Sequence, residues 1–107
     1  MIKVLAIIHK RPDMSREEFV RYWREVHAPL ASGMDGVRRY VINPTLEPFA
    51  PGAAAFDGVA ELWFDDAVGA RRAFASPVGI ATIQDLAKFA QPEKTQIVIA
   101  EEIPIVP

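Results

Sequence analysis

Two residues of the sequence have side chains suited to moving protons at a small organic molecule, His27 and Tyr40. His27 follows Trp23 by one helical turn and precedes Ala28-Pro29, where a proline ends or kinks a helix. The C-terminal end of a helix favours the imidazolium, whereas partial burial disfavours it, so we expect a pKa near neutrality. A general acid or base is useful in that range. The alternative is a histidine that packs on Trp23 and bonds a last-turn carbonyl.

Tyr40 lies on an expected strand directly after the basic pair Arg38-Arg39. A phenol that faces the helices can donate a hydrogen bond to a carbonyl or phenolate and stabilise the charge that develops there. The alternative is an ordinary strand aromatic with its hydroxyl at the rim of the sheet. The sequence therefore indicates an acid–base residue and a hydrogen-bond donor, provided that the fold brings them together.

Aromatic side chains supply the candidate walls of a ligand pocket. Trp23 and Trp63 are expected to line one apolar space with Tyr22, and either indole could stack on a flat ligand. For Trp23 the pattern favours core packing. Trp63 shares its strand face with Glu61, and some polar opening must serve that carboxylate. His9 ends the first strand and is a second-rank candidate, expected to be solvated.

Composition limits the other classes of function. The chain has 107 residues, half of them apolar, a formal charge of -2 and no cysteine. We therefore expect one domain, no disulfide or zinc–thiolate site, and no nucleic-acid partner. The two histidines have no second ligand at metal-binding spacing, and no phosphate-binding glycine loop is present, so neither a metal nor a cofactor is expected. No apolar run is long enough to span a membrane, which favours a cytoplasmic protein.

The segment 15–30 is expected to form the helix that positions His27. Ser15 and Glu18 match a capping box, in which the hydroxyl accepts from a first-turn N–H and the carboxylate reaches back to the Ser15 amide. On a helical wheel, large apolar side chains fall in one stripe with charged residues opposite. The stripe predicted to pack on the rest of the protein consists of Phe19, Tyr22, Trp23, Val26 and Leu30.

Four strands and a second helical region complete the chain. Apolar runs and alternation predict strands over residues 2–9, 37–42, 58–64 and 94–102. A helix is expected from Asp65 or Asp66 to Phe74, followed by a helical piece over 79–90 that packs through Ile80, Ile83, Leu86 and Ala87. This order predicts an α+β fold over residues 1–107: a ferredoxin-like βαββαβ domain whose antiparallel sheet carries both helices on one face.

The segment 43–57 contains three prolines and fits neither a helix nor a strand. A loop of that length in a short chain suggests a lid or a pocket wall, and the alternative is a variable hairpin tip.

The first and last strands are apolar on both sides, although one face of a lone antiparallel sheet should meet solvent. A second copy of the chain is the simplest cover, because a two-fold dimer hides identical patches with one interface. We therefore expect a homodimer that joins through its sheet faces into a barrel-like centre.

Several stretches together resemble the EthD family of dimeric α+β barrel proteins, over nearly the whole chain. These are Lys10-Arg11-Pro12, the segment 14–30, Gly36 to Tyr40, and Asp57 to Phe64. The specific parts are Tyr-Trp-Arg-x-x-His-Ala-Pro and Asp-Gly-x-Ala-Glu-Leu-Trp-Phe. Members of the family are associated with degradation of ethyl tert-butyl ether. Close relatives include lactone isomerases and cofactor-free cyclases or dehydratases of polyketide-like substrates. The resemblance implies the fold without fixing the reaction, since one fold hosts many activities.

The resemblance also implies roles for particular residues. In the methylmuconolactone isomerase branch, a histidine at the end of the first helix and a tyrosine on the second strand act on the substrate, and His27 and Tyr40 match those positions. Asp85 with Phe89 matches an Asp-x-x-x-Phe pattern of the family's second helical region, which makes both substrate-binding candidates. On the helical wheel, however, Asp85 points away from Ile83, which favours a solvent-facing carboxylate. Some barrel relatives use haem, so His27 as an axial ligand is a further alternative.

These features predict a small cofactor-independent enzyme that acts on an apolar carbonyl or aromatic compound by isomerisation, dehydration or ring closure. The alternative is a non-catalytic dimeric binding or accessory protein of a degradation pathway. A third possibility is a cofactor-free monooxygenase that acts on an electron-rich phenol. A ligand-sized cavity reached by both His27 and Tyr40 would favour the enzyme, whereas a packed interior with both groups satisfied by protein partners would favour the binding protein.

Overall fold

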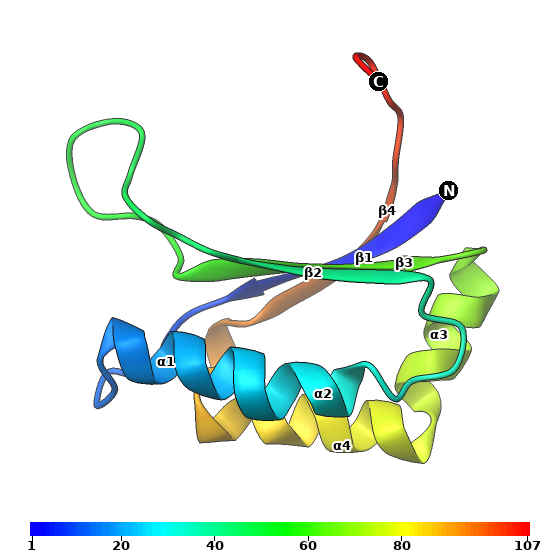
Figure 1. Cartoon of the computed structure of the whole chain (residues 1–107), viewed down its shortest axis with the longest axis horizontal. Coiled ribbons are helices and arrows are strands. Elements are labelled where there is room, and N and C mark those ends of the chain that lie inside the picture. The colour runs from blue at the N-terminus through cyan, green and yellow to red at the C-terminus, as the bar shows by residue number, and fades with distance from the viewer.

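A four-stranded antiparallel sheet, in the order β2-β3-β1-β4, carries every helix on one face (Figure 1). This computed structural model describes all residues from Met1 to Pro107. The predicted α+β, ferredoxin-like βαββαβ arrangement is confirmed. The strands are β1 (Ile2–Ile8), β2 (Arg39–Pro44), β3 (Gly58–Phe64) and β4 (Gln96–Glu101). The helical elements are α1 (Arg16–Tyr22), η1 (Trp23–His27), α2 (Ala28–Ala31), α3 (Ala67–Ala75), α4 (Pro77–Asp85), η2 (Leu86–Lys88) and η3 (Pro92–Lys94).

The first helical region begins at the predicted capping box. The Glu18 amide donates to the Ser15 hydroxyl at 3.1 Å, and the Ser15 amide donates to the Glu18 carboxylate at 3.0 Å. These bonds satisfy first-turn N–H groups that have no partner inside the helix. They fix where α1 starts, and therefore which residues of the next turns face the sheet.

The same helix widens into a π-helical turn, η1, where it carries His27. Pro29 has no N–H to donate to the carbonyl of Glu25, so the regular bonding pattern fails at that point. The Ala28 amide instead donates to the Trp23 carbonyl, five residues earlier. The helix then continues past the proline to Ala31, beyond the end predicted from the sequence. Such wide turns commonly occur at functional positions.

The wide turn changes which residues of this region are buried. Phe19, Trp23, His27 and Ala31 are each at most 4% exposed. Val26 is 48% exposed, so its predicted place in the packing stripe is wrong. The wheel assumed a regular helical period, whereas η1 adds a residue to one turn and brings His27 to the face that packs on the sheet.

In the second helical region, Ser76 accepts from the Gly79 amide and Pro77 opens α4. Gly79 lies so close to α3 that a Cβ there would meet the Ala73 carbonyl oxygen at 2.2 Å. This close approach sets the rotation of α4, which buries Gly79 and Thr82. Ile80 and Ile83, predicted to pack inward, are 49% and 38% exposed. The prediction was therefore wrong for Ile80, for Ile83 and for Ala87, which is also exposed, whereas Leu86 is buried as predicted.

The two faces of the sheet differ in what covers them. Side chains alternate along each strand, so Val4, Ile8 and Leu62 face the helices and form part of the core. The opposite face, here called the open face, has no helix over it (Figure 1). Its apolar residues come from all four strands: Leu5, Ile7, Val41, Val59, Val98 and Ala100.

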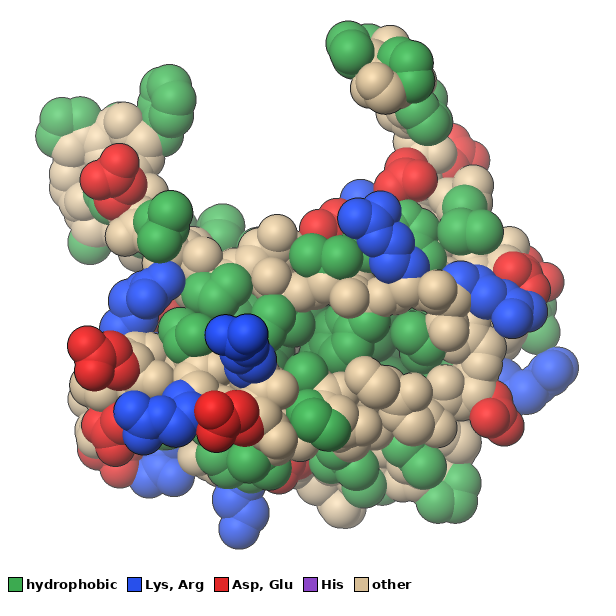
Figure 2. Space-filling view, viewed as in Figure 1, with side chains coloured by type: hydrophobic (Ala, Val, Ile, Leu, Met, Phe, Trp, Pro, Cys, Tyr) green, Lys and Arg blue, Asp and Glu red, His purple; other side chains and the backbone are tan.

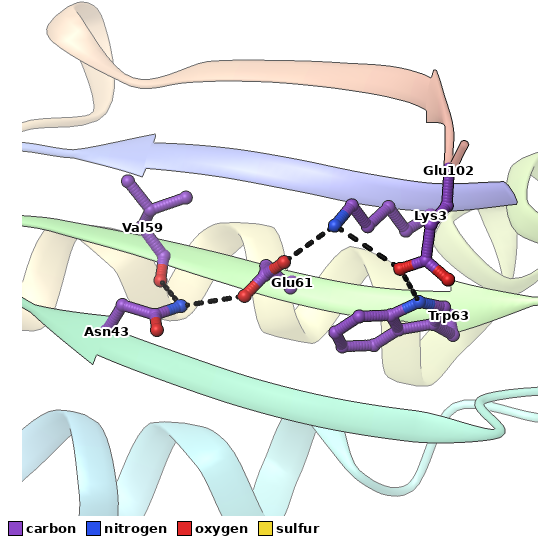
Figure 3. A network of polar contacts seen from close by, with 6 residues as sticks. All are labelled: Lys3, Asn43, Val59, Glu61, Trp63 and Glu102. Carbon is purple, nitrogen blue, oxygen red and sulfur yellow. Dashed lines mark hydrogen bonds and ion pairs between the residues drawn. The ribbon is translucent and has the colours of Figure 1, made fainter. Parts of the chain in front are cut away.

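A polar network crosses the open face (Figure 3). Lys3 donates to Glu61 at 2.8 Å and lies 3.5 Å from the carboxylate of Glu102. Glu61 also accepts from the Asn43 amide at 3.1 Å, and Glu102 accepts from the Trp63 indole at 2.9 Å. The Lys3 ammonium holds the pKa of Glu61 below its usual value. Lys3, Glu61 and Glu102 are thus joined in one network.

Two segments project from the open-face side of the sheet and stand apart with a hollow between them (Figure 2). One is the loop that joins β2 to β3, which matches the predicted irregular segment, and the other is the C-terminal tail. Both carry apolar side chains that are between 65% and 110% exposed: Leu46, Phe49, Ile103, Ile105 and Val106. No helix of the chain has the length and apolar character needed to span a bilayer.

Candidate functional site

An apolar cavity lies between the helices and the covered face of the sheet, and both His27 and Tyr40 line it. Twelve of its fourteen lining residues are hydrophobic. Its enclosed core measures about 30 Å³, and the empty space including the open mouth is about 360 Å³. The core has room for a few water molecules or for one polar group of a ligand. The sequence-based pairing of these two residues is thus geometrically possible.

His27 is held in one orientation by Asp85. Its Nδ1 lies 2.9 Å from Asp85 Oδ2, and the Tyr22 hydroxyl donates to Asp85 Oδ1 at 2.8 Å. The Asp85 side chain is only 15% exposed, so the prediction of a solvent-facing carboxylate was wrong. The rotation of α4 that buries Thr82 also turns Asp85 toward the first helical region. The aspartate bridges two side chains of one helix rather than facing water.

This contact determines which nitrogen of His27 can act as a base. A carboxylate only accepts hydrogen bonds, so Nδ1 carries the proton and the lone pair is on Nε2. Burial lowers the pKa of His27 below its ordinary value of 6.5, and Asp85 opposes this shift by favouring the charged ring. The neutral imidazole therefore predominates at neutral pH. The ring that lines the cavity is therefore a neutral base rather than a cation.

Phe89 and Tyr22 support His27 from the side away from the cavity. The Phe89 ring is fully buried, lies 4.7 Å from the His27 ring and stacks on Tyr22 at 5.3 Å. Neither residue lines the cavity. Burial raises the pKa of Tyr22 to about 12, with a further contribution from its bond to Asp85. The phenol therefore remains a donor to the aspartate, and both residues position His27.

Tyr40 and Trp23 bring two hydrogen-bond donors to the cavity. Burial raises the pKa of Tyr40 to about 12, although the nearby Trp23 indole opposes this shift. The Trp23 Nε1 atom is buried and makes no hydrogen bond of ordinary geometry. Gly58 leaves space for this indole, because a Cβ there would lie 2.3 Å from the ring.

Trp63 lies on the open face, so the expectation that it shares a space with Trp23 is wrong. Odd and even positions of β3 point to opposite sides, and Trp63 alternates with Leu62, which packs in the core. The Trp63 ring lies under the Arg39 guanidinium, 4.6 Å from its centroid, and its N–H is taken by Glu102. The apolar character of Trp63 alone could not show which face of the sheet it occupies.

Two functional features had no clear signal in the sequence. The partnership of His27 with Asp85 joins residues 58 positions apart, which no local spacing reveals. Thr82 lines the cavity but donates to the Val78 carbonyl at 2.8 Å, so its hydroxyl is occupied.

The described residues contain no group of three or more histidine, cysteine, aspartate or glutamate side chains that could hold a metal ion.

Several solved structures have a fold similar to that of this chain. An ethyl tert-butyl ether degradation family protein from Bacillus halodurans is 25% identical, with a TM-score of 0.79, over 96% of this chain and 100% of its own. A dimeric protein of ferredoxin-like fold from Bacteroides fragilis is 14% identical, with a TM-score of 0.70, over 94% and 95% of the two chains. SnoaB, a cofactor-independent oxygenase from Streptomyces nogalater, is 14% identical, with a TM-score of 0.67, over 99% and 96%.

A comparison with curated proteins gives no match. A family model does match, namely that of the EthD domain over residues 11–93. That range includes the helix with His27, the strand with Tyr40, and the Asp85–Phe89 segment. Because the match extends over most of the sequence, the chain belongs to the EthD domain family.

Proposed function

We propose that this protein is a cofactor-independent acid–base enzyme that moves a proton within an apolar carbonyl compound. The observation that carries the proposal is the convergence of His27 and Tyr40 on one apolar cavity, with His27 oriented by Asp85. A neutral imidazole and a protonated phenol form the pair that enolisation requires, namely a base for a C–H proton and a donor for the oxygen that gains charge.

In the proposed step, His27 Nε2 removes a proton from the carbon next to a carbonyl group. The C–H electron pair forms a C=C bond, and the carbonyl oxygen becomes an enolate that accepts a hydrogen bond from Tyr40. The imidazolium then returns the proton to a different carbon, which gives an isomer, or to a leaving hydroxyl group, which gives an alkene and water. Asp85 stabilises the transient imidazolium through Nδ1.

The test uses α-angelica lactone, a small neutral lactone whose double bond moves when one proton is removed from carbon and returned elsewhere. We expect wild-type protein to accelerate its conversion to the conjugated isomer. His27→Ala should lower the rate by about 10²- to 10⁴-fold, the usual contribution of a general base. Tyr40→Phe should lower it by roughly 10²-fold or more, as for an oxyanion donor. The control is His9→Ala, because His9 does not line the cavity. Unchanged rates in both cavity variants would disprove the mechanism.

A second candidate function is non-catalytic ligand binding, as an accessory protein of a degradation pathway. The small enclosed core, about 30 Å³, favours it, because enzyme pockets for drug-sized ligands commonly measure roughly 300–1,000 Å³. A protein that binds neutral carbonyl compounds in this cavity but exchanges none of their α-protons for deuterium in heavy water would support this candidate. Oxygen uptake with an electron-rich phenol would instead favour a cofactor-free oxygenase.

We further propose that two copies pair through their open faces into a barrel-like homodimer. Leu5 and Val98 are neighbours across β1 and the edge strand β4, on an apolar surface that no helix of the chain covers. The loop and tail on either side carry exposed apolar side chains, so a second copy seated between them would cover these side chains as well (Figure 2). Sedimentation should give twice the chain mass of 11.9 kDa. A cytoplasmic location remains a prediction.

A further inference from the structure

The buried indole N–H of Trp23 is the starting point. Trp23 is fully buried, and its Nε1 is the only buried side-chain polar atom without a hydrogen-bond partner. Unpaired buried donors are rare in native proteins because desolvation without a new bond is unfavourable. Trp23 lines the cavity. An acceptor atom that enters the cavity would therefore supply the hydrogen bond that this N–H lacks.

Tyr40 supplies a second donor at the same place. Tyr40 lines the cavity, and the only polar side chain that acts on its pKa is Trp23, as a hydrogen-bond donor to the phenol oxygen. The phenol is protonated at neutral pH, since burial raises its pKa to about 12. The Trp23 N–H thus lies near the Tyr40 oxygen, but no hydrogen bond of ordinary geometry joins them. Both the N–H and the O–H can therefore donate to an acceptor that enters the cavity. The remaining free polar group in the lining, His27, carries an unpaired lone pair rather than a donor.

The charge of the surroundings limits what the two donors can bind. No lysine or arginine lines the cavity. Lys3 and Arg39 lie on the open face, where they contact Glu61 and Trp63. A carboxylate in an apolar cavity without a cation is strongly unfavourable. A neutral carbonyl oxygen meets no such penalty.

We propose that the Trp23 indole N–H and the Tyr40 hydroxyl form a two-donor site for one oxygen of a neutral ketone, lactone or ester, and that this site rejects carboxylates. The ligand class rests on the proposed function, which places a carbonyl compound in this cavity. The site gives Trp23 a specific role in binding beyond core packing. It also aligns the carbonyl group so that its neighbouring carbon can approach His27.

The experiment follows the indole N–H signals of ¹⁵N-labelled protein during titration with three small probes. Cyclopentanone presents a carbonyl oxygen, methylenecyclopentane has nearly the same shape without the oxygen, and cyclobutanecarboxylate adds a charge. The chain has two tryptophans, and the Trp63 N–H is already bonded to Glu102 on the other face. Trp63 is therefore an internal control in every spectrum.

We expect cyclopentanone to shift the Trp23 signal downfield and to leave the Trp63 signal unchanged. Tyr40→Phe, which removes only the hydroxyl, and Trp23→Phe should each weaken cyclopentanone binding by roughly 2- to 10-fold, the effect of one hydrogen bond. Binding of methylenecyclopentane should stay the same in these variants. The carboxylate should leave the Trp23 signal in place.

Three results would overturn the site. The first is a Trp23 signal that no concentration of cyclopentanone shifts, and the second is carboxylate binding as tight as ketone binding. The third is a large shift of the Trp23 signal when Tyr40→Phe is made and no ligand is present. Such a shift would mean that the Trp23 N–H already donates to the Tyr40 oxygen in the free protein. If Trp23→Phe does not fold, cyclopentanone binding to Tyr40→Phe alone tests the site. Lactone isomerisation is a separate readout, so its failure with intact ketone binding would refute the proposed function and leave this site standing.

Discussion

The two faces of the sheet treat polar groups in opposite ways. On the open face, Lys3, Glu61 and Glu102 are each bonded to another side chain of the same face (Figure 3). On the covered face, Trp23 has an unpaired N–H, and the cavity beside it contains one hydroxyl without a partner of good geometry. The network on the open face thus leaves no hydrogen-bonding side chain of its members unpaired, whereas the covered face does.

This difference indicates which face binds a ligand and which binds another protein. Lys3 contacts both Glu61 and Glu102, and the Arg39 guanidinium over the Trp63 ring supplies the second positive charge of this face. A second surface can therefore cover the open face without burying an excess of charge. A cavity with unpaired donors gains a hydrogen bond when an oxygen-bearing molecule enters. The covered face therefore has the features of a small-molecule site and the open face those of an interface. Four sets of substitutions test this assignment of the two faces.

The largest effect is expected from Val98→Lys on the open face. A lysine at this position would bury an unpaired charge in each half of the proposed interface, so the dimer should separate completely into single chains. Light scattering of the eluted protein measures the mass. The matched control is Val68→Lys on α3, because Val68 is 64% exposed and lies away from this face. A Val98→Lys protein that keeps the wild-type mass would rule out this face as the interface.

The second effect concerns Asp85 on the covered side. Asp85→Ala leaves both the His27 Nδ1–H and the Tyr22 hydroxyl without an acceptor, which should lower the free energy of unfolding by about 1–3 kcal/mol. Asp65→Ala is the control, since Asp65 pairs with Arg38 where both side chains are more than half exposed, and no measurable change is expected. Urea unfolding measures both. Equal losses would mean that the buried contact has no special role.

Most of the fold could be predicted from the sequence because its signals are local. The capping box at Ser15 fixed the start of the first helix, and alternation along 58–64 gave β3 with its observed ends. Rotations of helices were less predictable. They depend on contacts such as Gly79 against the backbone of α3 and on the wide turn before Pro29, which a regular helical wheel does not contain.

The candidate site was predictable only where its residues could be recognised from local sequence. His27 and Tyr40 could be selected because their chemistry is unusual for their positions, and the fold then places both at one cavity. The role of Asp85 depends on a contact between residues remote in sequence. Trp63 was misplaced because an aromatic residue fits either face of a strand, and only the neighbouring strands decide between them.

The third effect is on the pH dependence of stability. The pKa of His27 is below 6.5 in the folded protein, so the unfolded chain takes up a proton first as the pH falls. The free energy of unfolding should therefore decrease between pH 6.5 and the lower folded pKa, and this group should contribute no slope above that window. Glu61 contributes its stability until the pH falls below 4.5, in a separate window. His27→Gln should remove the upper slope in urea unfolding at several pH values, whereas His9→Gln should keep it.

The smallest effect is expected from Trp63→Phe, which removes the N–H that Glu102 accepts and part of the surface under Arg39. In a solvent-exposed network this loss is minor, because water replaces the bond and screens the charges. Beneath a second copy of the chain, the carboxylate of Glu102 would lose a partner that water cannot replace. The melting temperature should therefore fall more when Trp63→Phe is made in the wild-type protein than when it is made in Val98→Lys, where the partner is absent. Equal shifts in the two backgrounds would mean that the network remains in contact with water, and that the polar groups of the open face are paired for reasons unrelated to a partner.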